Sequence, residues 1–166
     1  MINTRDIKKN LFTKENIFFF ILIIFIFFLD RYSKNIILNN FSENTFYIND
    51  FLNFDLIWNT GIGFGLLSNN SSLTYSLITV LIGLVILILM YFSFSSDKID
   101  KFIFSIIIGG ALGNFYDRLS LQAVPDFIDL HFKNFHWFTF NVADIFITIG
   151  IIAFILRNIS IKNNNG

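Results

Sequence analysis

The 166-residue chain is 54% hydrophobic and 14% charged, whereas a soluble domain has about 25% charged residues, so the composition excludes a disordered chain and disfavours a soluble one. Twelve basic and twelve acidic residues cancel, so the charge gives no reason to expect a nucleic-acid partner. Because the chain has no cysteine, disulfides, thiolate zinc sites and cysteine nucleophiles are excluded.

The first apolar segment runs from Ile17 to Leu29, and its 13 residues are too few to cross a bilayer. A helix that continues to Leu38 carries Asp30 and Lys34 four residues apart, on one face, where they form an ion pair within the scaffold. A secretory signal peptide is the alternative, but no cleavage site of small residues follows. We therefore predict an uncleaved span over residues 17–38.

Three further segments have the length or composition of membrane spans. The segment 73–94 has no charge over 22 residues, which gives about 33 Å of helix at 1.5 Å per residue, against a hydrocarbon core of about 30 Å. The segment 102–116 contains Gly109, Gly110 and Gly113, and such small residues let neighbouring helices approach closely. The last span is expected over 138–156. The predicted fold is an all-α membrane protein with four transmembrane helices in one domain, residues 1–166.

Lys and Arg outside the spans are concentrated on one side of this arrangement. Eight lie in the two tails and the 95–101 loop, and two lie in the outer segments 39–72 and 117–137: Arg5, Lys8, Lys9, Lys14, Lys98, Lys101, Arg157 and Lys162, against Arg118 and Lys133. The positive-inside rule therefore predicts that both termini are cytoplasmic. The aromatic, partly alternating segment from Phe46 to Phe64 predicts a small hairpin or sheet on the outer leaflet, with Tyr47 and Trp58 at headgroup depth.

Asp144 is the plainest candidate for chemistry, because a carboxylate inside a span is costly and points to function. Its expected place is four to six residues inside the last span, roughly 6–9 Å below the outer interface. Asn141 precedes it by three residues, on the same helical face. The alternative is that Asp144 only holds the bundle together through an interhelical hydrogen bond.

A second carboxylate is expected from the outer segment 117–137. Two carboxylates held together share a proton, so that one is an acid while the other activates water. Asp117 precedes Arg118 and is better explained by an ion pair. Asp126 follows Pro125, a helix-start signal, and ranks first by a small margin. Asp129 stays open from spacing alone.

Other polar motifs give weaker signals. The glycine-rich segment 59–65 lacks the Lys-Ser/Thr of a P-loop and is expected to form a tight turn. His131 and His136 can join Asp126 or Asp129 at a metal, but they are five residues apart, and helical ligand pairs need a spacing of three or four. We therefore predict a metal-free carboxylate pair and no cofactor.

Four motifs, in this order along the predicted spans, resemble those of the bacterial lipoprotein signal peptidases, known as signal peptidase II. They are Asp-Arg-Tyr-Ser-Lys at 30–34, Asn-Thr-Gly-Ile-Gly-Phe at 59–64, Gly-Gly-Ala-Leu-Gly-Asn-Phe-Tyr-Asp-Arg at 109–118, and Val-Pro-Asp-Phe at 124–127 followed by Phe-Asn-Val-Ala-Asp at 140–144. The sequence departs from the usual pattern at Ser33 for threonine, Gly63 for alanine and Gln122 for glycine.

The resemblance implies an aspartic endopeptidase of the bacterial cytoplasmic membrane, with its active site near the outer leaflet. Its catalytic pair would be Asp126 and Asp144. Further residues would line or brace the site, namely Asn59, Gly61, Asn114, Arg118 and Asn141, and Asp30 and Lys34 would support it. The substrates would be diacylglyceryl-modified prolipoproteins, cut just before the lipidated cysteine. We expect the enzyme to work as a monomer in the phospholipid bilayer.

Two rival hypotheses come from other classes of protein. In a small transporter or channel subunit, Asp144 and Asp30 would relay protons or bind a cation, which predicts an inverted repeat that the sequence does not show. In a structural subunit the buried charges would only dock helices, and Asp144→Asn would leave function intact.

Overall fold

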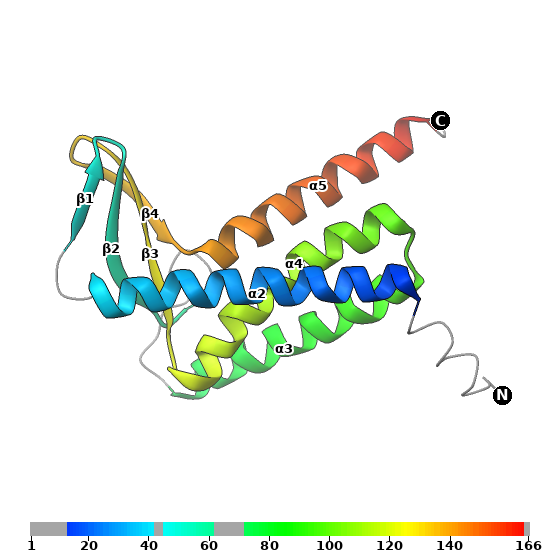
Figure 1. Ribbon diagram of the computed structural model, residues 1–166, viewed down its shortest axis with the longest axis horizontal. Helices are drawn as coiled ribbons and strands as arrows, with labels where there is room; N and C mark the ends of the chain where they lie inside the picture. The colour runs from blue at the N-terminus through cyan, green and yellow to red at the C-terminus, as the bar shows by residue number, and fades with distance from the viewer. Residues whose placement is uncertain (1–12, 42–44, 62–71, 165–166) are drawn as a thin grey trace.

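Four long apolar helices form the body of the computed structural model, which describes residues 13–41, 45–61 and 72–164. They are α2 (Lys14–Asn40), α3 (Ser72–Ser95), α4 (Lys98–Ser120) and α5 (Val142–Asn164). All four are long and apolar enough to cross a membrane. With a small antiparallel sheet at one end (Figure 1), they confirm the predicted fold class.

Helix starts are fixed by side-chain caps. Thr13 accepts a hydrogen bond from the Asn16 N–H at the start of α2, and Asp97 accepts from the Ile99 and Asp100 N–H groups at the start of α4. The expected start of the last span, at Phe138, is wrong, because residues 138–140 belong to a strand and α5 begins at Val142. The apolar run Phe-Thr-Phe suits either element, so hydropathy alone extends the helix too far.

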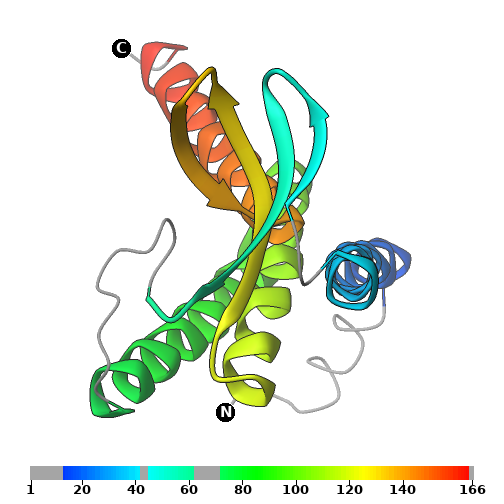
Figure 2. The same cartoon turned by 90° about the vertical axis from the view of Figure 1, so that its left-hand side faces the viewer.

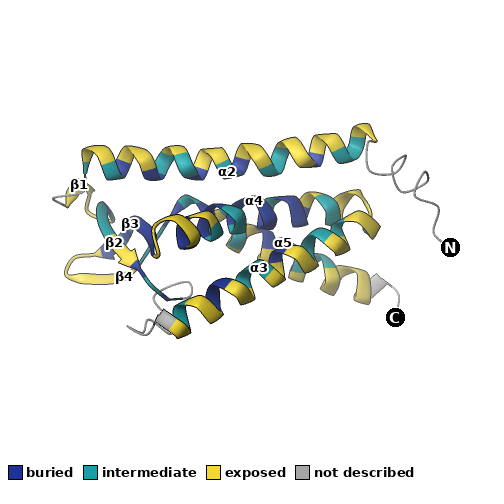
Figure 3. Cartoon of the chain, turned by 90° about the horizontal axis from the view of Figure 1, so that it is seen from below, coloured by how far each residue is buried: buried dark blue, intermediate teal, exposed yellow. Residues whose placement is uncertain are grey.

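Helix α4 occupies the centre of the bundle. In the most apolar 18-residue stretch of α4, 50% of the residues are buried, against 11–17% in the corresponding stretches of the other three helices. Figure 3 shows the buried residues gathered along α4. Its glycines allow this position: a Cβ on Gly109 would lie 2.8 Å from Ile26 of α2, and one on Gly110 would lie 2.6 Å from the Ala143 carbonyl of α5. The predicted role of these small residues in close helix packing is confirmed.

The outward faces of the helices are apolar. Along α3 the exposed side chains include Leu77, Leu81, Leu84 and Ile88. Exposed apolar surface of this extent is the surface of a protein that lies in lipid, where every backbone polar group must be bonded within its own helix.

The sheet has four antiparallel strands in the order β1-β2-β3-β4: β1 (Phe46–Asn49), β2 (Leu52–Asn59), β3 (Val124–Phe132) and β4 (Phe135–Phe140). The expected hairpin is β1–β2, and β3–β4 is a second hairpin that the sequence analysis did not predict. Interpreting Pro125 as a helix start is wrong, because it lies in β3. It pairs with Trp58, and the pairing with β4 begins only at Ile128, so a missing N–H is tolerated there.

The sheet lies where α2 and α4 end and where α3 and α5 begin (Figures 1 and 2). The opposite end of the bundle, where α2 begins and α5 ends, carries a separate group of charges. There Arg157 pairs with Asp97 and Asp100, and Lys101 lies 3.5 Å from Glu15. The buried polar residues described below all lie toward the sheet.

Candidate active site

Asp126 is held in β3 by two amide side chains. It is 3% exposed. The Asn59 Nδ2 of β2 donates to its Oδ2 at 2.9 Å, and the Asn141 Nδ2 donates to its Oδ1 at 2.6 Å. Both oxygens of the carboxylate are therefore fixed by neutral donors from elements on either side of the strand.

Asp144 is held by the start of its own helix. Asn141 precedes α5 directly, and its Oδ1 accepts from the Asp144 N–H at 3.1 Å, while Asp144 Oδ2 accepts from the Asn141 N–H at 3.2 Å. This reciprocal pair is a capping box, which satisfies two free N–H groups of the first turn. Asp144 thus lies in the first turn of α5 rather than four to six residues inside it, and the positive end of the helix dipole favours its charge.

Asn141 connects the two carboxylates. It is fully buried, its side-chain N–H donates to Asp126, and its backbone N–H donates to Asp144. Burial, together with the nearby charge of Asp144, raises the pKa of Asp126 to about 6, against the opposing effect of the Asn59 and Asn141 hydrogen bonds. The structure therefore brings together the two residues that the resemblance predicts as a catalytic pair.

A buried lysine orients Asn114, another hydrogen-bond donor to Asp144. Lys34 is fully buried and donates to Asp30 at 2.7 Å, to Asp117 at 2.7 Å and to Asn114 Oδ1 at 2.8 Å. Because an ammonium group only donates, the atom of Asn114 that faces it must be the oxygen. The Nδ2 of Asn114 is then left for Asp144 Oδ1, which it contacts at 2.8 Å.

Asp30 also caps the helix that carries Asp144. Its Oδ2 accepts from Lys34, as the four-residue spacing predicted, and its Oδ1 accepts from the Ala143 N–H at 3.0 Å. This approach needs a glycine on α4, because a Cβ on Gly113 would lie 2.4 Å from Asp30 Oδ2. Three helices thus meet at this one carboxylate.

Asp117 is ion-paired as expected, but with different partners. It contacts Lys34 and Arg31 of α2, and no pair with its neighbour Arg118 is found among the described residues. Successive residues of a helix point in different directions, so adjacency in sequence does not make a pair.

Arg118 instead supports the turn that follows β2. It donates to the Gly61 carbonyl at 2.9 Å and to the Asn114 carbonyl at 3.1 Å. The Gly61 N–H in turn donates to Asn59 Oδ1 at 2.9 Å, which leaves the Asn59 Nδ2 directed at Asp126. The tight turn is expected over residues 59–65, of which 62–65 lie outside the described residues; at Gly61 the backbone N–H holds Asn59.

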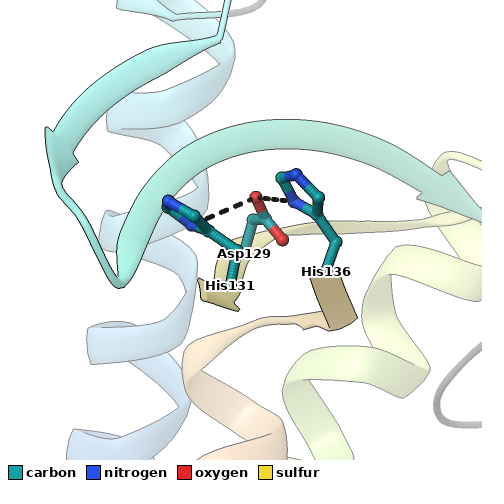
Figure 4. A group of neighbouring side chains, drawn as sticks. All are labelled: Asp129, His131 and His136. Atoms are coloured by element: carbon teal, nitrogen blue, oxygen red, sulfur yellow. Dashed lines mark hydrogen bonds and ion pairs between the residues drawn. The ribbon is translucent and has the colours of Figure 1, made fainter. Parts of the chain in front are cut away.

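Asp129, the alternative partner for Asp144, is engaged elsewhere. It lies further along β3 and contacts His136 Nδ1 at 2.8 Å (Figure 4). Of the three carboxylates in the outer segment, only Asp126 shares Asn141 with Asp144.

A cavity of about 250 Å³ opens beside Asp144, between the β3–β4 hairpin and α5. Apart from Asp144 and Thr148 its lining is apolar: Leu130, Phe138, Phe140, Ile145 and Ile149. This cavity was not predicted from the sequence. The available signal was helical spacing, because Thr148 lies one turn after Asp144 and Ile149 one turn after Ile145.

Two of the departures from the family pattern have clear structural settings. Gln122 has a φ of 57°, in the left-handed region that favours glycine. Ser33 keeps a hydroxyl that donates to the Asp30 carbonyl at 2.8 Å. Gly63 lies outside the described residues.

These features define a class: a membrane-spanning protein with a buried and a half-buried carboxylate linked by one asparagine, at the sheet end of its bundle, an arrangement suited to acid–base hydrolysis. The family model described as Signal peptidase (SPase) II matches residues 22–160. A lipoprotein signal peptidase of Pelagibacter ubique is 50% identical over 146 residues, which are 86% of this chain and 88% of that protein. One from Aquifex aeolicus is 44% identical over 80% of each chain. The chain therefore belongs to the signal peptidase II family.

Solved structures agree with this assignment. A structure described as a bacterial membrane enzyme superposes with a TM-score of 0.76 and 28% identity, over 89% of this chain and 91% of the other. A second has a TM-score of 0.68, 29% identity and 84% and 90% coverage. The protein is a peptidase, so the transporter and structural-subunit hypotheses are wrong.

Proposed function

We propose that Asp126 and Asp144 are the catalytic pair with which this protein removes the signal peptide of diacylglyceryl-modified prolipoproteins, just before the lipidated cysteine. The observation that carries the assignment is the shared contact with Asn141, whose two N–H groups donate to the two carboxylates. A pair held this way can keep one proton between its members.

The reaction needs one ionised and one protonated carboxyl. The ionised carboxylate takes a proton from water, and the water oxygen bonds to the scissile carbonyl carbon while the other carboxyl protonates the carbonyl oxygen. The tetrahedral intermediate collapses when its C–N bond breaks. The leaving nitrogen takes the proton first removed from water, and the hydroxyl returns its proton to the other carboxylate. The pair ends in its starting charge state.

The elevated pKa of Asp126, about 6, supports this role. An ordinary exposed aspartate is fully ionised near neutral pH, with a pKa of about 3.9. The raised value lets the pair hold a proton at pH values where a free carboxyl has lost it.

The surroundings of the pair suit an apolar substrate in a membrane. The cavity beside Asp144 would receive an apolar side chain or acyl chain of the prolipoprotein. Trp58 is 48% exposed on β2 and would hold the peptide from the sheet side. Phe64, the other residue expected in this contact, lies outside the described residues. Trp58→Ala should raise KM with little change in kcat for a lipidated peptide, and an unchanged KM would count against the contact.

We further propose that the sheet end faces outward, with both termini cytoplasmic and the active site near the outer leaflet. The bias of Lys and Arg toward the tails and the 95–101 loop supports this orientation. In this orientation the catalytic pair lies on the side of the membrane to which exported prolipoproteins are delivered. The proposal also takes residues 1–166 as one peptidase domain that acts as a monomer.

The test is cleavage of a diacylglyceryl-modified prolipoprotein by the full chain in nanodiscs. Asp126→Asn and Asp144→Asn should each lower kcat by about 1,000-fold or more. Asp50→Asn is the matched control, because Asp50 is an exposed aspartate in the β1–β2 turn and should leave kcat unchanged. Thermal unfolding shows that each variant is folded. Cleavage within tenfold of the parent rate in either catalytic variant would overturn the pairing.

A further inference from the structure

The β3–β4 hairpin brings three metal-ligating side chains together, away from the partners of the catalytic pair. Asp129 and His131 lie two residues apart in β3, and His136 of β4 is the direct cross-strand partner of His131. Their ligand atoms all lie within 4.8 Å of one another. Figure 4 shows the carboxylate of Asp129 between the two imidazole rings.

The helical spacing rule that disfavoured a metal here does not apply to a hairpin. Residues two apart in a strand share a face, and a cross-strand pair places the third side chain on the same face. The two-residue loop after Phe132, in which Lys133 has a φ of 55°, sets the register that pairs the histidines.

Two buried polar atoms, one in this cluster and one on the neighbouring strand β2, have no hydrogen-bond partner among the described residues. One is Nδ1 of His131, a residue that is 8% exposed, and this atom lies 3.8 Å from Asp129 Oδ2. The other is Oδ1 of Asn53, which is 9% exposed and is the direct partner of Asp129 across the β2–β3 pairing, hence on the same face. Unpaired buried polar atoms are rare in folded proteins and need an explanation.

We propose that Asp129, His131 and His136 form a binding site for a zinc ion, next to the free oxygen of Asn53. Two imidazole nitrogens and one carboxylate oxygen are a ligand set that zinc accepts, with a fourth position for water or for the Asn53 amide oxygen. The ion would satisfy both buried atoms at once.

The geometry requires only side-chain movement. In tetrahedral zinc sites with bonds of about 2.0–2.1 Å the ligand atoms are roughly 3.3 Å apart, so atoms that now lie within 4.8 Å of one another must draw together. The two imidazole rings stack with centroids 5.1 Å apart, so one ring must turn. His136 can do so, because its side chain is 55% exposed.

The site would connect the two strands that position the catalytic pair. Asp129 follows Asp126 by three residues in β3, and β4 leads through Asn141 into α5. An ion shared by β3 and β4 would lock their register. The inference does not depend on the proposed function, because the carboxylate pair uses neither histidine.

The test is zinc binding by the untagged full chain in nanodiscs, measured by competition with a chromophoric chelator. The chain has two histidines and no cysteine, so no other imidazole or thiolate can contribute. We expect one zinc ion per chain, and an affinity at least about 100-fold weaker in His136→Gln and His131→Gln. Asp55→Asn, on neighbouring β2, is the control and should bind like the parent.

Two further measurements make the outcome decisive. Zinc should raise the unfolding temperature of the parent but not of His136→Gln, whose half-exposed side chain can be replaced without disturbing the core. Cobalt bound in place of zinc should give the visible absorption of a tetrahedral site in the parent alone. If the parent does not bind one equivalent, or if a variant that carries both His131→Gln and His136→Gln still does, the cluster is only an Asp129–His136 hydrogen bond and the proposal is wrong.

Discussion

Replacing Lys34 by methionine removes the charge at the centre of the buried network and keeps a side chain of similar length. Lys34 is fully buried and has three acceptors within 2.8 Å. In the variant Asp117 keeps Arg31, whereas among the described residues Asp30 keeps only the Ala143 N–H. Removing one partner of a buried ion pair costs about 3–5 kcal/mol, because the other charge is left uncompensated.

This loss is large enough to measure as a shift of the unfolding temperature. For a protein of this size 1 kcal/mol corresponds to about 2–4 °C, so Lys34→Met should unfold roughly 6–20 °C lower. The fluorescence of the two tryptophans, Trp58 and Trp137, reports the transition. Lys98→Met is the matched control: the Lys98 side chain is 79% exposed and lies 3.5 Å from Glu15, and exposed pairs contribute less than about 1 kcal/mol.

The same substitution should reduce activity while the protein is still folded. Without the ammonium group, the contact that directs the oxygen of Asn114 away from Asp144 is lost, and a displaced catalytic group costs about 100-fold in rate. Adding Asp30→Asn to Lys34→Met removes the uncompensated charge and should restore at least half of the lost stability. Equal unfolding temperatures for Lys34→Met and Lys98→Met, or no recovery in the double variant, would refute this account of the network.

Four further predictions concern single residues around the pair. Gly113→Ala should lower the unfolding temperature more than Gly83→Ala, since the new Cβ lies 2.4 Å from the Asp30 carboxylate in the first case and 3.2 Å from the Phe115 ring in the second; equal shifts would argue against close packing at Asp30. Asn141→Ser keeps a helix cap but removes the donor to the buried Asp126 carboxylate, so it should lose about 1–3 kcal/mol of stability and about 100-fold in kcat; Asn141→Ala also lacks the cap and should lose about 1 kcal/mol more, and full activity in either variant contradicts the bridging role. The pKa of Asp126 is raised from 3.8 in the unfolded chain to about 6, so the folded state binds more protons between these pH values. The free energy of unfolding should therefore fall as pH rises from about 4 to 6, by roughly 3 kcal/mol at most. Denaturant titrations should show this pH dependence in the parent and not in Asp126→Asn. Gln122→Gly should stabilise the protein by about 1 kcal/mol, because the φ of 57° costs a side-chain residue that much, and a lower unfolding temperature would contradict it.

Local spacing in the sequence predicts the contacts that lie within one helix. The Asp30–Lys34 pair follows from its four-residue separation and is present at 2.7 Å. The other partners of Lys34 are 80 and 83 residues away, on α4. No periodicity specifies which faces of two helices meet, so these contacts are not predictable from spacing.

The start of α5 shows a signal that hydropathy hides. Phe138 and Phe140 extend the apolar run of the helix toward its N-terminus, but Asn141 followed three residues later by Asp144 has the pattern of a capping box and marks the start at Val142. Interpreted in this way, the same two residues identify both the helix end and the position of a carboxylate whose backbone is fixed.

Strand register explains why Asp126 and Asp129 could not be separated by spacing. Both lie in β3 and both are buried. What distinguishes them is the partner that each meets: Asn141 for Asp126, and His136 across the hairpin for Asp129. Register depends on the turn between β3 and β4 and on pairing with β2, which joins residues some 70 positions apart.

The site separates its charges from its reacting groups. Among the described residues, amide side chains donate to both carboxylates: Asn59 and Asn141 to Asp126, and Asn114 to Asp144. The charged Lys34 acts one residue further away, through Asn114. A lysine bonded directly to Asp126 would stabilise its ionised form and lower its pKa, and the pair would then hold its shared proton only at a lower pH. Neutral donors orient the carboxylates with less of that effect, so burial and the mutual repulsion of the pair still raise the pKa of Asp126 to about 6.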